Sequence, residues 1–104
     1  MKLYTIEFGK YYEVNGIIHQ ECTNQPAFLN QNDANDEIEY YMKNYFVGAY
    51  LGEIPDKTIS GYYLEVYEDD IKLSKKEIYE INETHCYHLD GGSNLIKSLI
   101  IRFY

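Results

Sequence analysis

The sequence predicts an α+β domain: an antiparallel sheet of two hairpins plus a middle strand, with one main helix and a short second helix on one face. Three observations lead to this prediction. Segments near both ends alternate apolar and polar residues, a central segment repeats apolar residues at helical spacing, and an Asn-Gly pair marks a tight turn. The 104 residues are 45% hydrophobic, which suits one domain, residues 1–104, with a core of its own.

A strand is predicted at residues 3–8, and the first hairpin at residues 11–21. The segment LYTIEF alternates like a strand, and Asn15-Gly16 is the strongest short turn signal because both turn positions need a positive φ. This turn sets a register in which Val14 pairs with Ile17, Tyr12 with His19 and Lys10 with Glu21. The following segment, CTNQPAFLNQN, is broken by Pro26 and is expected to be a loop.

The main helix is predicted over residues 33–46. Apolar residues three and four positions apart form one face: Ile38, Tyr41, Met42, Tyr45 and Ala49. Asn32 or Asp33 is expected to cap the N-terminus of the helix, and Gly48 or Gly52 to end it, with Pro55 following. The outer face is expected to carry Glu39, Tyr40 and Lys43.

The middle strand is predicted over residues 58–67, where the pattern again has a period of two. The core face of this strand is expected to consist of Tyr62, Leu64 and Val66. The opposite, exposed face is expected to consist of Tyr63, Glu65 and Tyr67. Three acids in a row, Glu68-Asp69-Asp70, are expected to form the turn after the strand.

The last third of the chain predicts a short helix and a second hairpin. Ser74 and Glu77 form a capping box, flanked by a hydrophobic staple of Leu73 and Ile78, which favours a helix over residues 75–82. The segment EIYEIN also alternates, so a strand is the alternative there. The hairpin is expected to join THCYHL to NLIKSLIIRFY through a turn at residues 90–93. Its last strand is apolar on both faces, as is usual for a central strand.

Charge is the most informative functional feature of the sequence. Residues 31–70 contain ten acids and two bases, which sum to −8, the net charge of the whole chain. A surface of this kind repels nucleic acid and membrane phosphates and attracts basic proteins. A solvated acidic face that only keeps the protein soluble is the alternative interpretation.

No motif in the sequence indicates catalysis or a bound metal. Potential zinc ligands are present as His19, Cys22, His85, Cys86 and His88. On strands, however, the spacings place most of these side chains on opposite faces. Cys86 and His88 would share a face about 7 Å apart, too far for a thiol and its base to form a hydrogen bond. We therefore expect no enzyme activity, no metal and no cofactor.

Nine residues are expected to contact a basic partner: Asp36, Glu39, Tyr40, Tyr63, Glu65, Tyr67, Glu68, Asp69 and Asp70. Carboxylates spaced along a rigid element can occupy the positions that DNA phosphates take on a basic protein. Tyrosine rings supply flat apolar area for affinity, while the charges speed association.

In size, charge and tyrosine content the chain resembles small acidic anti-defence proteins of phages and mobile elements, namely anti-CRISPR and antirestriction proteins that mimic DNA. Its segment FGKYYEVNGIIHQ is similar to the first strands of ArdA antirestriction proteins, which are longer chains. The resemblance assigns no role to individual residues. It implies an inhibitor that binds and blocks a basic nucleic-acid-handling partner, such as a CRISPR effector or a restriction enzyme.

Two other functions fit the same profile: an immunity protein that neutralises a toxin nuclease, and a non-enzymatic interaction module. In all three cases we expect no direct contact with nucleic acid or membranes. The start of the chain, MKLYTIEFGK, has charges where a signal peptide would be apolar, so a cytoplasmic protein is expected. The sequence does not predict the oligomeric state.

Overall fold

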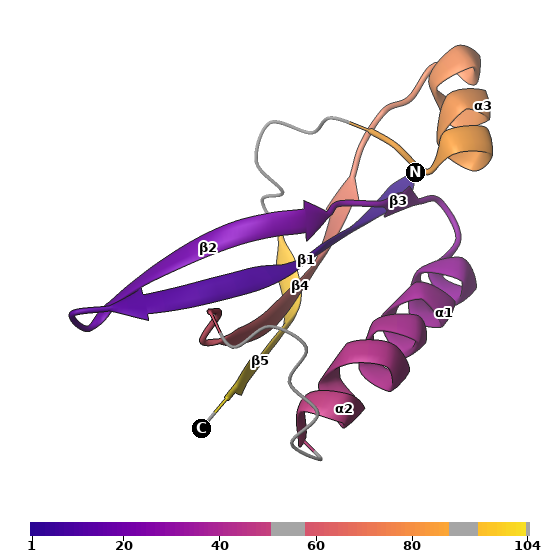
Figure 1. Ribbon diagram of the computed structural model, residues 1–104. Helices are drawn as coiled ribbons and strands as arrows, with labels where there is room; N and C mark the ends of the chain where they lie inside the picture. The colour runs from indigo at the N-terminus through magenta and orange to yellow at the C-terminus, as the bar shows by residue number, and fades with distance from the viewer. Residues whose placement is uncertain (51–57, 88–93, 104) are drawn as a thin grey trace.

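The computed structural model describes residues 1–50, 58–87 and 94–103. It confirms the α+β class, with a five-stranded antiparallel sheet, one main helix and a shorter second helix (Figure 1). In chain order the elements are β1 (Lys2–Val14), β2 (Ile17–Asn24), β3 (Ala27–Phe28), α1 (Gln31–Tyr41), the π-helical turn η1 (Met42–Phe46), α2 (Val47–Tyr50), β4 (Gly61–Asp70), α3 (Lys75–Thr84) and β5 (Leu95–Arg102).

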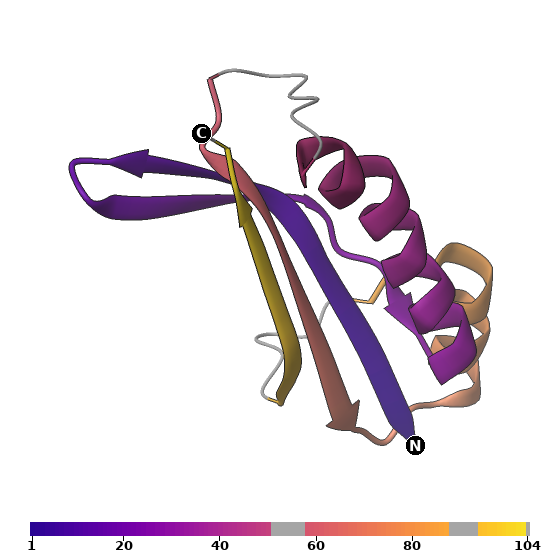
Figure 2. The same cartoon turned by 90° about the horizontal axis from the view of Figure 1, so that it is seen from below.

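The sheet has the order β2-β1-β4-β5, and β3 pairs with the beginning of β1. The helix α1 lies along one face of the sheet, and α3 lies beside β3, near the N-terminus of the chain (Figures 1 and 2). The first hairpin is confirmed, including its three predicted pairs. Asn15 and Gly16 have φ values of 54° and 78° in its turn.

The helical segment is longer than predicted and changes its winding in the middle. The N-cap is Asn30, whose side chain accepts a hydrogen bond of 2.8 Å from the Asn32 amide, so neither predicted cap is correct. Gly48 lies inside α2, while Gly52 and Pro55 lie outside the described residues. In η1 the Val47 amide donates to the Met42 carbonyl, a bond that spans five residues and widens the turn.

The predicted buried face of the main helix is confirmed. Tyr41 and Ala49 are buried, and the other three predicted residues are partly buried against the core. The wider turn also brings Phe46 to the sheet, so that the rings of Tyr45 and Phe46 lie 4.7 and 6.3 Å from the ring of Phe8. The outer position of Glu39 and Lys43 is confirmed as well, and these two residues form an ion pair of 2.8 Å.

The middle strand begins and ends three residues later than predicted, and Glu68-Asp69-Asp70 is not a turn. These acids are the last residues of β4 and pair with Tyr4, Leu3 and Lys2 of β1. The long first strand explains the error, because it offers backbone partners to the whole acidic run. It also offers charge partners, since Lys2 pairs with Glu68 at 2.7 Å and the N-terminal amine pairs with Asp70 at 2.9 Å.

The capping box is confirmed by both of its hydrogen bonds, and the helix it begins extends to Thr84. The strand alternative for EIYEIN is therefore wrong. The predicted strand at THCYHL is also wrong over residues 84–87, because the helix continues through Thr84 and ends at His85, whose φ of 53° is left-handed. Residues 88–93, with the expected turn, lie outside the described residues.

The last strand lies at the edge of the described sheet and is not central as predicted. β4 takes the central place because it pairs with both β1 and β5. Consequently the apolar side chains of Leu95, Ile96 and Ile100 remain 49–55% exposed.

Two glycines make room for tyrosine rings on the face of the sheet opposite α1. Gly9 pairs with Tyr63, and Gly61 pairs with Tyr11 on the neighbouring strand. A Cβ at Gly61 would lie 2.4 Å from a ring carbon of Tyr11 and 2.0 Å from the Ile101 carbonyl oxygen. Each ring therefore covers a glycine backbone, and both tyrosines are only 1% exposed. The expectation that Tyr63 is exposed is wrong for this reason.

Replacing Gly61 by alanine should lower the free energy of unfolding by about 1–3 kcal/mol, because the new methyl group collides with the Ile101 carbonyl oxygen and displaces the Tyr11 ring. Urea unfolding of the variant measures this loss. Gly16→Asn is the control, since nothing lies within 4 Å of its Cβ position and asparagine tolerates a positive φ. Equal stability of Gly61→Ala and the wild type would show that the Tyr11 ring does not require a glycine at position 61.

Candidate partner-binding groove

The nine residues expected to bind a partner do not form one surface. Asp36, Glu39 and Tyr40 are exposed on α1. On β4, Tyr62, Leu64 and Val66 pack in the same core as α1. The alternate residues Tyr63, Glu65 and Tyr67 therefore lie on the opposite face of the sheet. Glu68, Asp69 and Asp70 lie at the end of β4, beside the N-terminus.

The acids at the end of β4 are engaged within the protein. Asp69 is only 8% exposed, so its expected exposure is wrong. The N-terminal amine holds the pKa of the Asp70 carboxyl below its usual value, and Lys2 pairs with Glu68. A reversal of these charges would therefore disturb the junction of β1 and β4 as well as any partner contact.

The polar groups on the open face of the sheet also have partners within the fold. Glu7 and Glu65 are opposite each other in the β1–β4 register, an arrangement that is unfavourable for two negative charges. Tyr67 donates a hydrogen bond from its hydroxyl to Glu65, and the Gln20 amide donates a second one of 3.5 Å. The hydrogen bond from Tyr67 raises the pKa of this tyrosine to about 12.

The helix α1 carries the acids that line a groove. The groove has a volume of about 500 Å³ and is lined by Phe28, Asp33, Asp36, Glu37, Tyr40, Asn82 and His85. One wall comes from a single face of α1, where these residues follow each other at spacings of one, three and four. The other wall comes from the end of α3 and its cap. In the described part of the chain, no ion pair joins Asp33, Asp36 or Glu37 to a cation.

His85 is held firmly in the wall of this groove. Its amide donates to the Ile81 carbonyl at 2.8 Å, and its own carbonyl accepts from the Ala27 amide at 2.8 Å. Its ring lies 4.8 Å from the ring of Phe28. The hydrogen bond between Ala27 and His85 ties the end of α3 to β3, and β3 ends at Phe28, shortly before the N-cap of α1 at Asn30. This connection sets the distance between the two walls.

Sequence reasoning found Asp36 and Tyr40 of this groove and missed its other residues. Asp33, Asp36, Glu37 and Tyr40 have the spacing of one helix face, which would have identified the acidic wall. Asn82 and His85 had no signal of this kind, because their place depends on how α3 packs beside β3.

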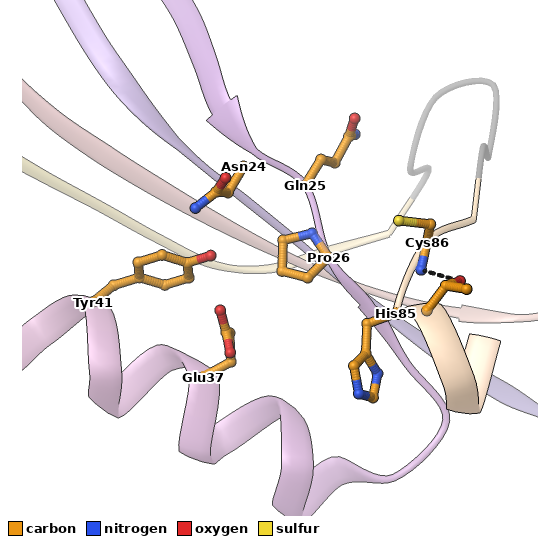
Figure 3. Close-up of a pocket in the computed structure, with 8 residues that line it drawn as sticks. Asn24, Gln25, Pro26, Glu37, Tyr41, His85 and Cys86 are labelled. Atoms are coloured by element: carbon orange, nitrogen blue, oxygen red, sulfur yellow. Dashed lines mark hydrogen bonds between the residues drawn. The ribbon is translucent and has the colours of Figure 1, made fainter.

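A smaller pocket adjoins the groove and shares Glu37 and His85 with it (Figure 3). It has a volume of about 230 Å³ and is lined by Asn24, Gln25, Pro26, Glu37, Tyr41, Thr84, His85 and Cys86. The Glu37 carboxylate, the Tyr41 hydroxyl and the Asn24 amide converge on it (Figure 3). The sulfur of Cys86 points toward Gln25, away from His85 (Figure 3).

The thiol of Cys86 lies at the edge of this pocket. The Cys86 amide donates to the Thr84 hydroxyl at 3.3 Å, and among the residues drawn in Figure 3 no base points at the thiol. Among the residues that the structure describes, no three His, Cys, Asp or Glu side chains are grouped to hold a metal ion. His88, the base considered for Cys86, lies outside those residues.

Comparison with family models, with curated proteins and with solved structures yields no match to this chain. No helix within residues 1–50, 58–87 and 94–103 is long and apolar enough to cross a membrane.

The Tyr67–Glu65 hydrogen bond stabilises the folded protein, and this stabilisation should be lost at alkaline pH. The pKa of Tyr67 is about 12 in the folded protein and 10.0 in its unperturbed state. The stability it contributes is therefore fully present below about pH 10 and is lost as the pH rises toward 12. Tyrosinate absorbance followed against pH should show this late titration.

In the Glu65→Gln variant the pKa of Tyr67 should move toward its ordinary value, because the charged acceptor is gone. Tyr67→Phe identifies the transition that belongs to this residue. A titration curve unchanged by Glu65→Gln would contradict the assigned cause.

Proposed function

We propose that this protein is a small acidic inhibitor that binds a basic nucleic-acid-handling partner through the groove between α1 and α3. One observation carries the proposal. Eight acids between residues 31 and 70 lie in the described structure, and five of them are engaged or buried: Glu39, Glu65, Glu68, Asp69 and Asp70. The other three, Asp33, Asp36 and Glu37, all line the groove.

The groove suits the basic side chains of a protein. Its carboxylates attract lysine and arginine, while Phe28 and Tyr40 provide apolar surface for their aliphatic stems. Tyr40 is 51% exposed, and its ring packs edge-on against Tyr41 and Tyr45 at 5.6 and 6.4 Å. An exposed aromatic ring that is already held in place loses little entropy on binding, which favours its use as an anchor.

The charge of the chain supports competition with nucleic acid. A net charge of −8 opposes any direct contact with DNA or RNA. The same charge steers the protein toward a surface that otherwise binds phosphates. A partner whose basic residues are occupied by this groove cannot use them for its substrate, and inhibition follows.

The proposal is tested by DNA cleavage assays with a CRISPR effector, a restriction enzyme and a toxin nuclease. The protein should inhibit at least one of them, less strongly as salt rises, and should displace its DNA. The double variant Asp33→Asn/Asp36→Asn should inhibit about tenfold less well, because two interface charges are lost.

Glu80→Gln/Glu83→Gln is the matched control, since it removes the same charge from exposed positions on α3 outside the lining of the groove. It should inhibit as well as the wild type. Equal losses in both double variants would mean that net charge alone acts. Inhibition that is indifferent to salt and to both variants would contradict the proposal.

A further inference from the structure

The hydroxyl of Tyr41 is buried at the wall of the smaller pocket and has no hydrogen-bond partner among the described residues. Tyr41 is 0% exposed, and its oxygen is among the few buried side-chain atoms in the described structure without a partner. Its ring has an ordinary reason to be buried, because it stacks on Phe8 at 4.5 Å with 13° between the planes. The hydroxyl has no such reason, since a buried polar group without a partner destabilises the folded state.

The hydroxyl points into the pocket that adjoins the groove (Figure 3). The Glu37 carboxylate lies one helical turn earlier on α1, and the Asn24 amide approaches from the end of β2. Both are close enough to influence the hydroxyl without forming a hydrogen bond with it. Burial raises the pKa of Tyr41, the Glu37 carboxylate raises it further, and Asn24 acts in the opposite direction.

We propose that this pocket binds the guanidinium group of one arginine side chain of the partner, an inference that rests on the proposed function. A guanidinium is planar and carries five N–H donors. The pocket offers complementary acceptors: the two carboxylate oxygens of Glu37 and the hydroxyl oxygen of Tyr41.

The position of the pocket agrees with this occupant. It shares Glu37 and His85 with the acidic groove, so a chain bound in the groove can turn one side chain into it. The ring of Pro26 lines the pocket beside the acceptors and supplies apolar contact for the side-chain stem (Figure 3). The free hydroxyl and the carboxylate would then both gain a partner on binding.

The direct test is a titration of the isotope-labelled protein with N-acetyl-L-arginine amide, followed by NMR. Saturable shifts should appear at the amides of Glu37, Tyr41 and Cys86. N-acetyl-L-citrulline amide has the same shape without the charge and should cause none. N-acetyl-L-lysine amide should bind several-fold more weakly, because a point charge engages fewer acceptors at once.

Glu37→Gln and Tyr41→Phe should each weaken binding of the arginine compound, Glu37→Gln by about tenfold. Glu39→Gln, which alters the neighbouring exposed face, should leave it unchanged. The melting temperature of Tyr41→Phe should not fall, because the lost hydroxyl has no partner inside the protein. A lower melting temperature, equal binding of citrulline or lysine, or unchanged binding by Tyr41→Phe would overturn the inference.

The inference and the proposed function can fail separately. If Asp33→Asn/Asp36→Asn loses inhibition while Tyr41→Phe inhibits fully, the groove stands and the arginine pocket is wrong. If the arginine compound binds as expected but no nuclease is inhibited or displaced from DNA, the pocket stands and the proposed function is wrong.

Discussion

The stack of Phe8 on Tyr41 joins the two layers of the molecule, and much of the structure depends on it. Phe8 lies in the middle of β1, and the rings of Tyr41, Tyr45, Tyr62 and Phe46 surround it at 4.5–6.3 Å. The π-helical turn serves this packing, because a regular α-helix would direct Tyr45 and Phe46 further apart. The stack also fixes the direction of the Tyr41 hydroxyl, so the core and the pocket share one side chain.

The other face of the sheet is stabilised in a different way. No helix is needed to bury Tyr11 and Tyr63, because each ring lies across a glycine of the neighbouring strand. The carboxylates on this face are held by tyrosine and glutamine donors, as at Glu65. Tyrosine suits such a sheet because its side chain supplies both an apolar ring and a hydrogen-bond donor.

The parts of the fold that depend on local pattern could be predicted from the sequence. The Asn15-Gly16 turn and the Ser74–Glu77 capping box each act within a few residues, and both are present as predicted. The edge position of β5 and the burial of Tyr63 depend on which strands become neighbours. Alternation along one strand carries no information about that choice, and it cannot distinguish a ring covered by a glycine from one exposed to water.

The candidate site, too, could be predicted only in part from local pattern. The secondary structure explains why its charges lie on a helix. A carboxylate on a strand has a cross-strand neighbour about 5 Å away, so a second carboxylate at that position opposes folding unless other groups pair with the charges. Early in a helix, the positive end of the helix dipole stabilises acids without a specific partner. Asp33 lies in the first turn of α1, where this effect is strongest, and Asp36 and Glu37 lie one turn further along the helix, where no neighbouring strand carries a charge opposite them. The sequence therefore shows where the acidic residues are, and the secondary structure decides which of them remain available to bind another molecule.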